Sequence, residues 1–345
     1  MRDALAGLEY EWVGAILVGG TEKLRPGGDY GVPLIDGFGD AELVVDLSDE
    51  PVLGPAERFR WISRALAAGL PYVGADFRFD PPRYAPLDVP SIAVIGTGKR
   101  VGKTAVTVRL AQLLARERRV VVVAMGRGGP PAPELVETPP TVDDLLARSA
   151  AGRHAASDHL EIALLAGVPT IGCRRAGGGL AGAVFASNVA EGAALAAARA
   201  PDVVVFDGSG AAVPPIAVDR RVLVVGRGQD VGAYLNPYRR LISDVVIVEP
   251  ELRLTPTAPL AGRVAVFTAG ATDVSHLDAD VVSVSAHLAD RAALHDDLVD
   301  ADTYLVELKG AAVDVVIAHA RERGIHVVIA ANELVDDGAL SELVA

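Results

Sequence analysis

The chain has 345 residues, half of them hydrophobic, and a formal net charge of −13. This length allows more than one hydrophobic core, so we expect two or three domains. The acidic balance argues against a nucleic-acid partner, because no basic face is expected to survive it.

The cysteine content and the distribution of apolar residues restrict the class of protein further. Cys173 is the single cysteine, which excludes an internal disulfide and a cluster of thiolate metal ligands. Acidic residues interrupt the N-terminus where a signal peptide needs an apolar core, and no later stretch is long and apolar enough to span a bilayer. We therefore expect a cytoplasmic protein.

Apolar segments of strand type alternate with segments of helical spacing along most of the chain. This alternation is typical of parallel sheets that are covered by helices on both faces, so the sequence predicts an α/β fold. Strands are expected at residues 13–18, 43–46, 92–95, 120–125, 203–207, 222–225, 245–248, 264–267, 303–306 and 326–330. Helices are expected at residues 2–9, 56–68, 104–117, 141–151, 185–200, 233–242, 288–299 and 310–323.

Four prolines within residues 77–90 interrupt the alternation and predict a domain boundary. We expect an N-terminal α/β domain at 1–85, a nucleotide-binding domain at 90–250 and a C-terminal α/β region at 251–345. The first domain opens with a helix, whereas a doubly wound domain normally begins with a strand. Either its first strand is missing or the domain is shortened.

A glycine-rich segment, GGTEKLRPGGDYGVP at 19–33, follows the first expected strand. Ligands of parallel sheets bind at the carboxyl ends of the strands, where this segment would lie. Lys23 and Arg25 are therefore candidates for contact with an anionic substrate. A solvated surface turn is the alternative for both residues.

The segment SIAVIGTGKRVGKT at 91–104 has the pattern of a buried strand, a glycine-rich turn and the start of a helix. The N–H groups of such a turn and the positive end of the helix bind phosphate oxygens. Lys103 would place its ammonium between the β- and γ-phosphates, and the Thr104 hydroxyl would be a magnesium ligand. The sequence therefore predicts an ATP or GTP site. Its loop residues are Gly96, Thr97, Gly98, Lys99, Arg100, Val101, Gly102, Lys103 and Thr104.

A phosphate-loop protein also needs a carboxylate beside its magnesium, and VVVFDGSG at 203–210 provides one. Asp207 ends an apolar strand and is the expected metal ligand, and the Gly208 amide is expected to meet the γ-phosphate. An ordinary strand and turn is the alternative, but the order of the two segments favours the functional interpretation. Glu134, which follows the strand at 120–125, is a candidate for a second magnesium contact.

Basic residues gather beside glycines in two further segments. Arg127 follows the strand at 120–125, and Arg174 and Arg175 precede three glycines at 177–179. Planar guanidinium groups beside flexible N–H groups are suited to hold phosphate or carboxylate groups. A surface arginine pair is the alternative for Arg174 and Arg175.

Two histidines and the rare lysines complete the polar candidates. His154 and His159 lack metal-like spacing, so each is either a general base or a residue that caps or packs. Lysine occurs at only four positions, and two of them, Lys99 and Lys103, lie in the phosphate loop. A GC-rich genome explains most of this bias toward arginine. It does not explain why two of the four lysines lie in the phosphate loop.

The combination of these segments resembles the cyclic 2,3-diphosphoglycerate synthetase family over nearly the whole chain. The phosphate loop, with Thr97 where the strict pattern has glycine, is similar to that of dethiobiotin synthetase. The motifs that carry the resemblance are GGTEKL at 19–24, DYGVP at 29–33, VIGTGKRVGKTAV at 94–106, MGRGGPP at 125–131, CRRAGGGLAG at 173–182, FDGSG at 206–210, NPYR at 236–239 and ELKGAAVDVV at 307–316.

The resemblance implies an N-terminal Rossmann-like α/β domain followed by a P-loop NTPase domain with a mostly parallel sheet. It also implies an ATP- and magnesium-dependent reaction in which 2,3-bisphosphoglycerate closes an intramolecular phosphoanhydride, giving cyclic 2,3-diphosphoglycerate, ADP and phosphate. Relatives suggest a homodimer, and whether potassium assists is left open. Positive charge for this transfer would come from Lys99, Arg100, Lys103, Arg127, Arg174 and Arg175.

Other functions fit the same phosphate loop. An ATPase of the maturation or partition type would act on a protein partner, and a kinase or ligase would act on another small anionic substrate. A nucleotide sensor would bind ATP without turnover. The arginine- and glycine-rich segment at 173–182 favours a small polyanionic substrate.

Overall fold

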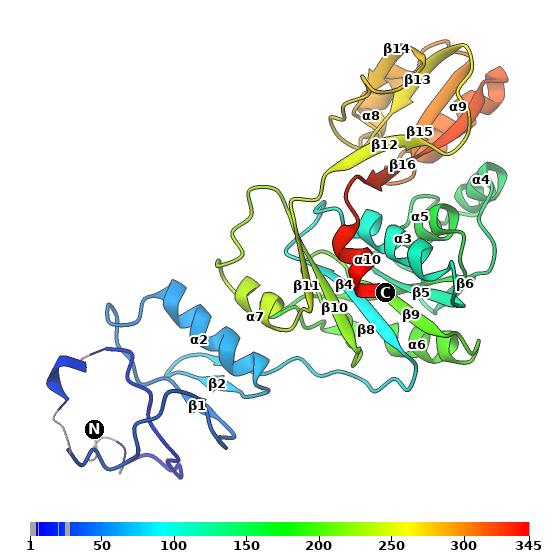
Figure 1. Ribbon diagram of the computed structural model, residues 1–345. Coiled ribbons are helices and arrows are strands. Elements are labelled where there is room, and N and C mark those ends of the chain that lie inside the picture. Colours follow the sequence, from blue (N-terminus) through cyan, green and yellow to red (C-terminus); the bar gives the residue numbers. More distant parts are fainter. Residues whose placement is uncertain (1–4, 6, 20, 25–27, 345) are drawn as a thin grey trace. The chain divides into compact units, whose positions relative to one another are not determined.

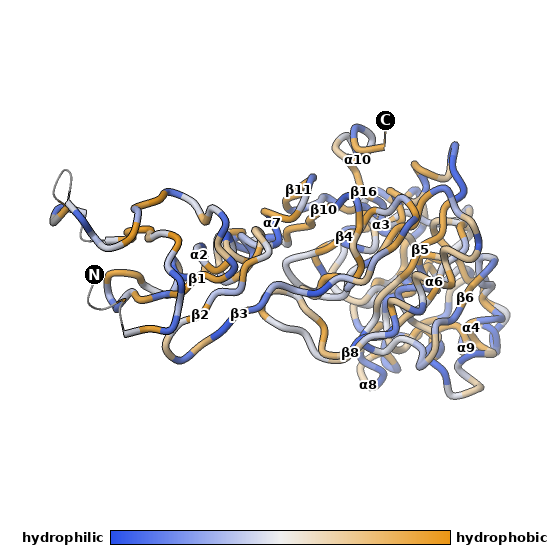
Figure 2. Tube along the Cα trace, turned by 90° about the horizontal axis from the view of Figure 1, so that it is seen from below, coloured by the Kyte–Doolittle hydropathy of each residue, from blue (hydrophilic) through white to orange (hydrophobic). Residues whose placement is uncertain are grey.

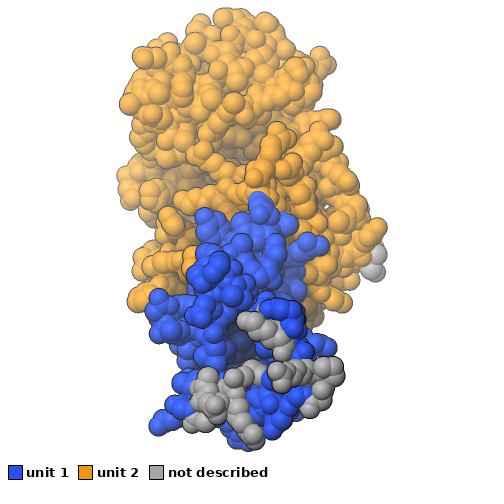
Figure 3. Space-filling view, turned by 90° about the vertical axis from the view of Figure 1, so that its left-hand side faces the viewer, with its two compact units in different colours: residues 1–83, 230–242 blue, residues 84–229, 243–345 orange. Residues whose placement is uncertain are grey.

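The computed structural model of the protein describes residue 5 and residues 7–19, 21–24 and 28–344. The chain divides into two compact units, which Figure 3 shows in different colours. Unit 1 comprises residues 1–83 and 230–242, and unit 2 comprises residues 84–229 and 243–345. Unit 1 is therefore discontinuous in sequence. The three-domain division expected above stays a prediction.

Unit 1 contains a three-stranded sheet in which two parallel strands are joined by a helix. The sheet has the order β1-β2-β3, with β3 antiparallel to β2. The helix α2 crosses from β1 to β2, and α7 packs against α2. The elements are η1 (Thr21–Lys23), β1 (Val44–Val45), α2 (Pro55–Ala67), β2 (Tyr72–Val73), β3 (Arg78–Phe79) and α7 (Asn236–Leu241).

The predicted strand at 13–18 is wrong. Ala15 makes only an isolated bridge with Leu34, and Val13 and Val18 are exposed. An apolar run forms a strand only where a neighbouring backbone completes its ladder and a core covers its side chains.

Half of the predicted helix at 2–9 lies outside the described residues, and residues 7–9 form a turn and a bend. Arg25 also lies outside the described residues. Its proposed contact with an anion therefore stays a prediction.

Unit 2 contains a large sheet of order β11-β10-β4-β9-β5-β7-β6, to which β8 adds beside β7. Its strands are parallel except for β6 and β8, which run antiparallel to β7. Both faces are covered, so the central strands are continuous apolar runs, as predicted. The strands are β4 (Ser91–Gly96), β5 (Val120–Gly126), β6 (Glu134–Val136), β7 (Thr170–Ala176), β8 (Ala186–Ser187), β9 (Val203–Asp207), β10 (Arg220–Val225) and β11 (Val245–Val248).

Helices cover this sheet on both sides. Figure 1 shows α3 (Lys103–Leu114) and α5 (Asp158–Ala166) over one face and α6 (Val189–Ala197) over the other. The helix α4 (Val142–Ala150) stands at the edge and begins with a capping box between Thr141 and Asp144. In Figure 2 the tube is largely orange along the strands of unit 2 and blue in many of its loops.

A second, five-stranded sheet of unit 2 has the order β12-β16-β15-β13-β14. Leu145 of α4 and Leu160 of α5 share one hydrophobic cluster with Phe267 and Tyr304 of this sheet, so one core joins the two sheets. The final helix, α10, packs back on α3. The elements are β12 (Leu252–Pro256), β13 (Arg263–Phe267), β14 (Asp280–Ser285), α8 (Arg291–Leu294), η2 (His295–Asp297), β15 (Thr303–Glu307), α9 (Val313–Arg323), β16 (His326–Leu334) and α10 (Gly338–Val344).

Several elements of unit 2 were not predicted from the sequence, and β7 and α5 matter for function. β7 has the sequence TIGCRRA, in which a glycine and two arginines break the apolar run. α5 is buried over most of its length, so it lacks the one-sided apolar spacing that marks a surface helix. The other elements missed were β6, β12, β14, α10 and β8, whose residues the sequence analysis placed in the helix at 185–200.

Candidate nucleotide and phosphate-transfer site

The phosphate loop occupies residues 97–102, between the end of β4 and the start of α3. Gly102 has a φ of 94°, and a Cβ there would lie 2.9 Å from Pro250 Cγ. A Cβ on Gly96 would lie 2.9 Å from Lys103 Cδ. The loop therefore requires glycine at both ends, which fits a backbone curled for phosphate.

Thr97 fastens the loop to the end of β10. Its N–H donates to Val224 O over 3.1 Å, and its Oγ1 accepts from the Gly226 N–H over 3.2 Å. Its hydroxyl also donates to the Gln229 side chain. The departure from the strict glycine pattern thus has a structural reason, because the threonine side chain ties the loop to its neighbouring strand.

Lys103 folds back onto the loop. Its side chain is buried, and Nζ donates to Gly98 O over 2.8 Å. Burial lowers the pKa of the Lys103 ammonium, Asp207 and Asp158 oppose this effect, and the charges of Lys309 and Arg175 add to it. A phosphate group would take the place of the Gly98 carbonyl as partner of this ammonium.

Asp207 lies in the middle of the sheet at the end of β9, where it pairs in register with Val94 of β4 and Ala124 of β5. The Thr107 hydroxyl donates to its Oδ1 over 2.8 Å. Complete burial and the charge of Asp158 raise the pKa of Asp207 to about 7, although Lys103 counteracts this. The carboxyl is thus placed near the first turn of α3, which carries Thr104.

Gly208 packs directly against β4. Its N–H donates to Val94 O over 2.9 Å, and a Cβ there would lie 2.9 Å from the same oxygen. Its amide is therefore engaged within the sheet in this structure, and its contact with the γ-phosphate stays a prediction.

Asp158 is a residue of this site to which the sequence assigned no role. It begins α5, and its Oδ2 would lie 3.9 Å from a Cβ on Gly126 at the end of β5. Its charge acts on Lys103, Asp207 and Lys309. The sequence signal was weak, since only its position after Ser157 at a helix start was visible.

Glu134 lies on β6 and is held by arginines. Arg148 Nη2 donates to its Oε2 over 3.0 Å, and Arg153 Nη1 lies 3.6 Å from its Oε1. The hydrogen bond from Arg148 lowers the pKa of this carboxyl. The second magnesium contact assigned to Glu134 stays a prediction, and among the described residues no group of three or more His, Cys, Asp or Glu side chains is arranged to hold a metal ion.

His159 is buried under β7, and a Cβ on Gly172 would lie 2.6 Å from its ring. Burial lowers the pKa of His159 to about 4. An imidazole of such low basicity, buried away from solvent, is a weak general base, which favours the packing alternative. His154 is exposed in the connection between α4 and α5.

The two adjacent arginines point to different surroundings, because side chains alternate along β7. Arg174 is exposed. Arg175 is buried and donates from Nη1 to Gly177 O over 2.6 Å and from Nη2 to Ser209 O over 2.8 Å. Its Nε is buried and has no hydrogen-bond partner among the described residues, so this donor of the guanidinium is unused there.

Further cations lie around Arg175. A Cβ on Gly210 would lie 3.4 Å from Arg175 Nη2 and 3.6 Å from Lys99 Cγ. Burial lowers the pKa of Arg175, and the charge of Arg127 adds to this effect. The structure thus brings Lys99, Arg127 and Arg175 to one region, at the carboxyl ends of β4, β5 and β7.

Glu161 joins this site to the second sheet. It is buried on α5, and Lys309 Nζ, from the segment after β15, lies 3.5 Å from its Oε1. Burial raises the pKa of Glu161 to about 7, and the ammonium of Lys309 opposes the shift. Neighbouring Glu307 accepts from the Ala269 N–H over 2.7 Å and from Asn332 Nδ2 over 2.6 Å.

This raised pKa gives a testable dependence of stability on pH. The folded state holds a proton on Glu161 that the unfolded state releases near pH 4.5, so the free energy of unfolding falls as pH rises from about 4.5 to 7. In Glu161→Gln this contribution disappears. We expect the free energy of unfolding of the variant, measured relative to that of the wild type, to be about 1–2 kcal/mol higher at pH 8 than at pH 5. Urea unfolding of both proteins at the two pH values measures it. An equal pH dependence in both would contradict the assignment.

Three family models match successive parts of the chain. The N-terminal domain of cyclic 2,3-diphosphoglycerate synthetase matches residues 32–80, its P-loop domain residues 91–254 and its C-terminal domain residues 261–333.

Curated relatives that bear the same name match over most of their length. The synthetase of Rubrobacter xylanophilus is 45% identical over 98% of this chain and 91% of its own. The synthetase of Methanothermobacter thermautotrophicus is 38% identical over 95% of this chain and 87% of its own. The synthetase of Pyrococcus abyssi is 40% identical over 86% of this chain and 79% of its own.

Among solved structures, LpxK from Aquifex aeolicus, determined in complex with ATP, covers 76% of this chain at 15% identity with a TM-score of 0.45. Within the described residues no helix is long and apolar enough to cross a membrane.

Proposed function

The chain belongs to the cyclic 2,3-diphosphoglycerate synthetase family, and from this premise we propose that it converts 2,3-bisphosphoglycerate and ATP into cyclic 2,3-diphosphoglycerate, ADP and phosphate. The observation that carries the proposal is that Lys103, Asp207 and Arg175 lie together at the carboxyl ends of the strands of the main sheet, within a chain of this family. We further propose a homodimer in the cytoplasm, which light scattering and fractionation would test.

The chemistry needs two displacements at phosphorus. An oxygen of one substrate phosphate attacks the γ-phosphorus of ATP, and ADP leaves. An oxygen of the second substrate phosphate then attacks the first substrate phosphorus, so that inorganic phosphate leaves and the ring closes. Both nucleophiles are already anions, so the protein has to neutralise charge and fix positions rather than supply a strong base.

The chain's own residues fit these tasks. The loop amides and Lys103 would hold the β- and γ-phosphates of ATP. Arg175, whose buried Nε–H has no partner in the part of the chain that the structure describes, would donate to a substrate phosphate, and Lys99 and Arg127 would add positive charge beside it.

A magnesium ion fits the donor set at this edge of the sheet. Thr104 would offer its hydroxyl and Asp207 its carboxylate, and hard oxygen ligands of this kind are those that Mg²⁺ prefers. Asp158 lies near both Lys103 and Asp207 and adds negative charge to the same place. When bound, the ion would neutralise charge on the β- and γ-phosphates.

The two arginines of β7 should respond differently to mutation. Arg174 is exposed, and among the described residues only its backbone makes hydrogen bonds, so Arg174→Ala should raise the KM for the bisphosphate roughly tenfold and leave the fold intact. Arg175→Ala removes the donors to Gly177 O and Ser209 O, so it should lower kcat and thermal stability together. Steady-state kinetics and thermal melts measure both. Unchanged KM in Arg174→Ala would remove that residue from the substrate site.

The function itself is tested by following ADP release and phosphorus NMR with Mg-ATP, with and without 2,3-bisphosphoglycerate. We expect the bisphosphate to accelerate ADP release and a cyclic pyrophosphate signal to grow in step. Binding of ATP without cyclisation would contradict the proposal and leave a different acid or a protein partner as the target of the ATPase.

A further inference from the structure

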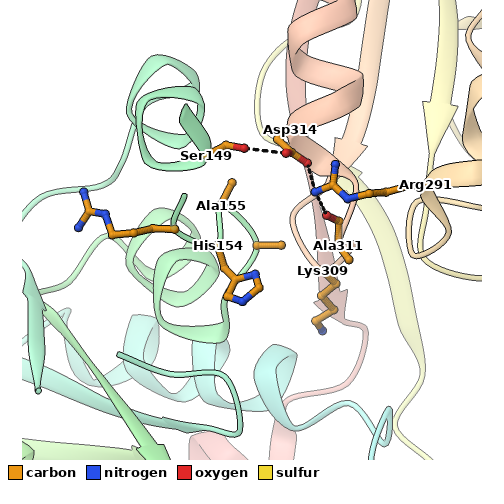
Figure 4. A pocket seen from close by; sticks show the side chains of 9 residues that line it. Ser149, His154, Ala155, Arg291, Lys309, Ala311 and Asp314 are labelled. Atoms are coloured by element: carbon orange, nitrogen blue, oxygen red, sulfur yellow. Dashed lines mark hydrogen bonds and ion pairs between the residues drawn. The ribbon is translucent and has the colours of Figure 1, made fainter. Parts of the chain in front are cut away.

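A second polar pocket lies within unit 2, between the connection of α4 to α5 and the segment after β15 (Figure 4). Its volume is about 170 Å³, which is the room of several water molecules and enough for one phosphate or carboxylate group. The polar side chains that line it are Ser149, Arg153, His154, Arg291, Lys309 and Asp314.

The side chains that line this pocket carry more positive than negative charge. Asp314 is its one acidic lining residue, and both its oxygens are engaged, since Ser149 Oγ donates to Oδ2 over 2.6 Å and Arg291 Nη2 to Oδ1 over 2.7 Å. Arg291 is thereby neutralised. Arg153, whose side chain is 57% exposed, has Glu134 at 3.6 Å, and Lys309 has Glu161 at 3.5 Å, and neither of these two carboxylates lines the pocket. A pocket of this charge suits an anion.

Lys309 connects the pocket to the nucleotide site. Its Nζ lies 3.5 Å from Glu161 Oε1, and its side chain is 31% exposed, so it faces both the buried carboxyl and the pocket. Its charge also acts on Lys103 and Asp207. In Figure 4 the tips of Lys309 and His154 point to the same side of the pocket.

The use of lysine in the chain agrees with this placement. Only four of its 32 basic residues are lysines, and Lys309 joins Lys99 and Lys103 near the phosphate-transfer site. An ammonium on a flexible stem is a compact point charge that can follow a phosphate through a reaction, whereas arginine holds a fixed plane.

We propose that this pocket binds an anionic group of the small acid substrate, and that Lys309 holds that group in reach of the nucleotide site. The second sheet would thus contribute a substrate-binding side to an active site whose other side is the phosphate loop. This inference rests on the proposed function, because it takes the phosphorylated acid as the ligand.

The test uses the full chain and three variants. Lys309→Met removes the central cation, and Arg153→Gln removes an exposed cation of the same pocket with little risk to folding. Arg321→Gln is the matched control. Arg321 on α9 forms an ion pair with Asp143 on α4 over 2.8 Å, so it also joins the second sheet's helix to the α4 region, but it is not among the residues that line the pocket. Calorimetry gives the Kd of 2,3-bisphosphoglycerate and, separately, of a non-hydrolysable ATP analogue, and thermal melts report folding.

We expect Lys309→Met to raise the Kd of the bisphosphate by roughly tenfold to a hundredfold, as for loss of a charge-assisted hydrogen bond. Arg153→Gln should raise it by roughly threefold, and Arg321→Gln should change it by less than about twofold. The Kd of the ATP analogue should stay within about threefold of the wild-type value in all three, because none removes a loop donor.

The outcomes separate this inference from the proposed function. If the wild type forms cyclic product while both pocket variants bind the bisphosphate normally, the pocket assignment is wrong and the function stands. If the wild type forms no cyclic product, yet both pocket variants weaken its binding of the bisphosphate, the pocket stands as an anion site and the function is wrong. If Lys309→Met does not fold, the comparison of Arg153→Gln with Arg321→Gln decides. Equal Kd values of these two variants for 2,3-bisphosphoglycerate would then overturn the proposal.

Discussion

Lys103→Ala should lower kcat for ADP release by roughly 10²–10³-fold. The buried ammonium of Lys103 now donates to Gly98 O, and the γ-phosphate would replace that oxygen when ATP binds. Because negative charge develops on the leaving ADP oxygens in the transition state, loss of the Lys103 ammonium between the β- and γ-phosphates should reduce kcat more than it weakens ATP binding. Coupled-enzyme kinetics and nucleotide titrations measure the two effects separately.

Lys99→Ala is the control for this experiment. Lys99 lies in the same loop but is exposed, so its loss should cost much less than that of Lys103. Thermal melts of both variants would show that the loop still folds. If Lys103→Ala kept more than a tenth of the wild-type turnover, the phosphate-loop assignment would be wrong.

Asp207→Asn should lose activity and gain stability at the same time. The change removes a charged oxygen ligand for Mg²⁺, so we expect kcat to fall by roughly 10²–10³-fold at any magnesium concentration. The amide oxygen can still accept from the Thr107 hydroxyl, so the local packing is kept.

The gain in stability has a defined pH window. The pKa of Asp207 is raised to about 7 in the folded state, so the folded protein binds a proton there that the unfolded chain has released above about pH 4. The Asp207 contribution therefore lowers the free energy of unfolding of the wild type as pH rises from 4 to 7, and Asp207→Asn lacks this contribution while it keeps that of Glu161. At pH 8 in the absence of nucleotide we expect the variant to be more stable by about 2 kcal/mol, with a smaller difference at pH 5. Urea unfolding measures it, and lower stability at pH 8 would show that the buried carboxylate stabilises the fold.

The nucleotide site could be predicted because its signals are local in sequence. Strand, glycines, Lys103 and helix follow one another within 91–104, and Asp207 ends a second apolar strand. Each signal depends on backbone geometry and burial within a few residues, which a sequence pattern records. The parallel main sheet was predicted for the same reason, since its strands are continuous apolar runs.

What the sequence did not predict depends on contacts between distant segments. Asp158 and Lys309 are about 150 residues apart and meet only because the second sheet packs against α4 and α5. The partner of Glu134 is Arg148, fourteen residues later and on the next helix, and the partners of Arg175 are main-chain carbonyls. The predicted strand at 13–18 was wrong for the opposite reason, because within the described residues this apolar run forms only an isolated bridge, between Ala15 and Leu34.

The discontinuity of unit 1 has a consequence for how the protein can be divided. The chain leaves unit 2 after Gln229, whose side chain accepts a hydrogen bond from Thr97 of the phosphate loop, and returns at Ser243. A fragment that ends at Arg83 would lack α7 and uncover the face of α2 that α7 packs against, whereas a fragment that begins at Tyr84 would keep α7 without its partner. A single cut therefore releases neither unit intact. The crossing at 229–230 begins at Gln229, the residue that accepts the hydrogen bond from the phosphate loop.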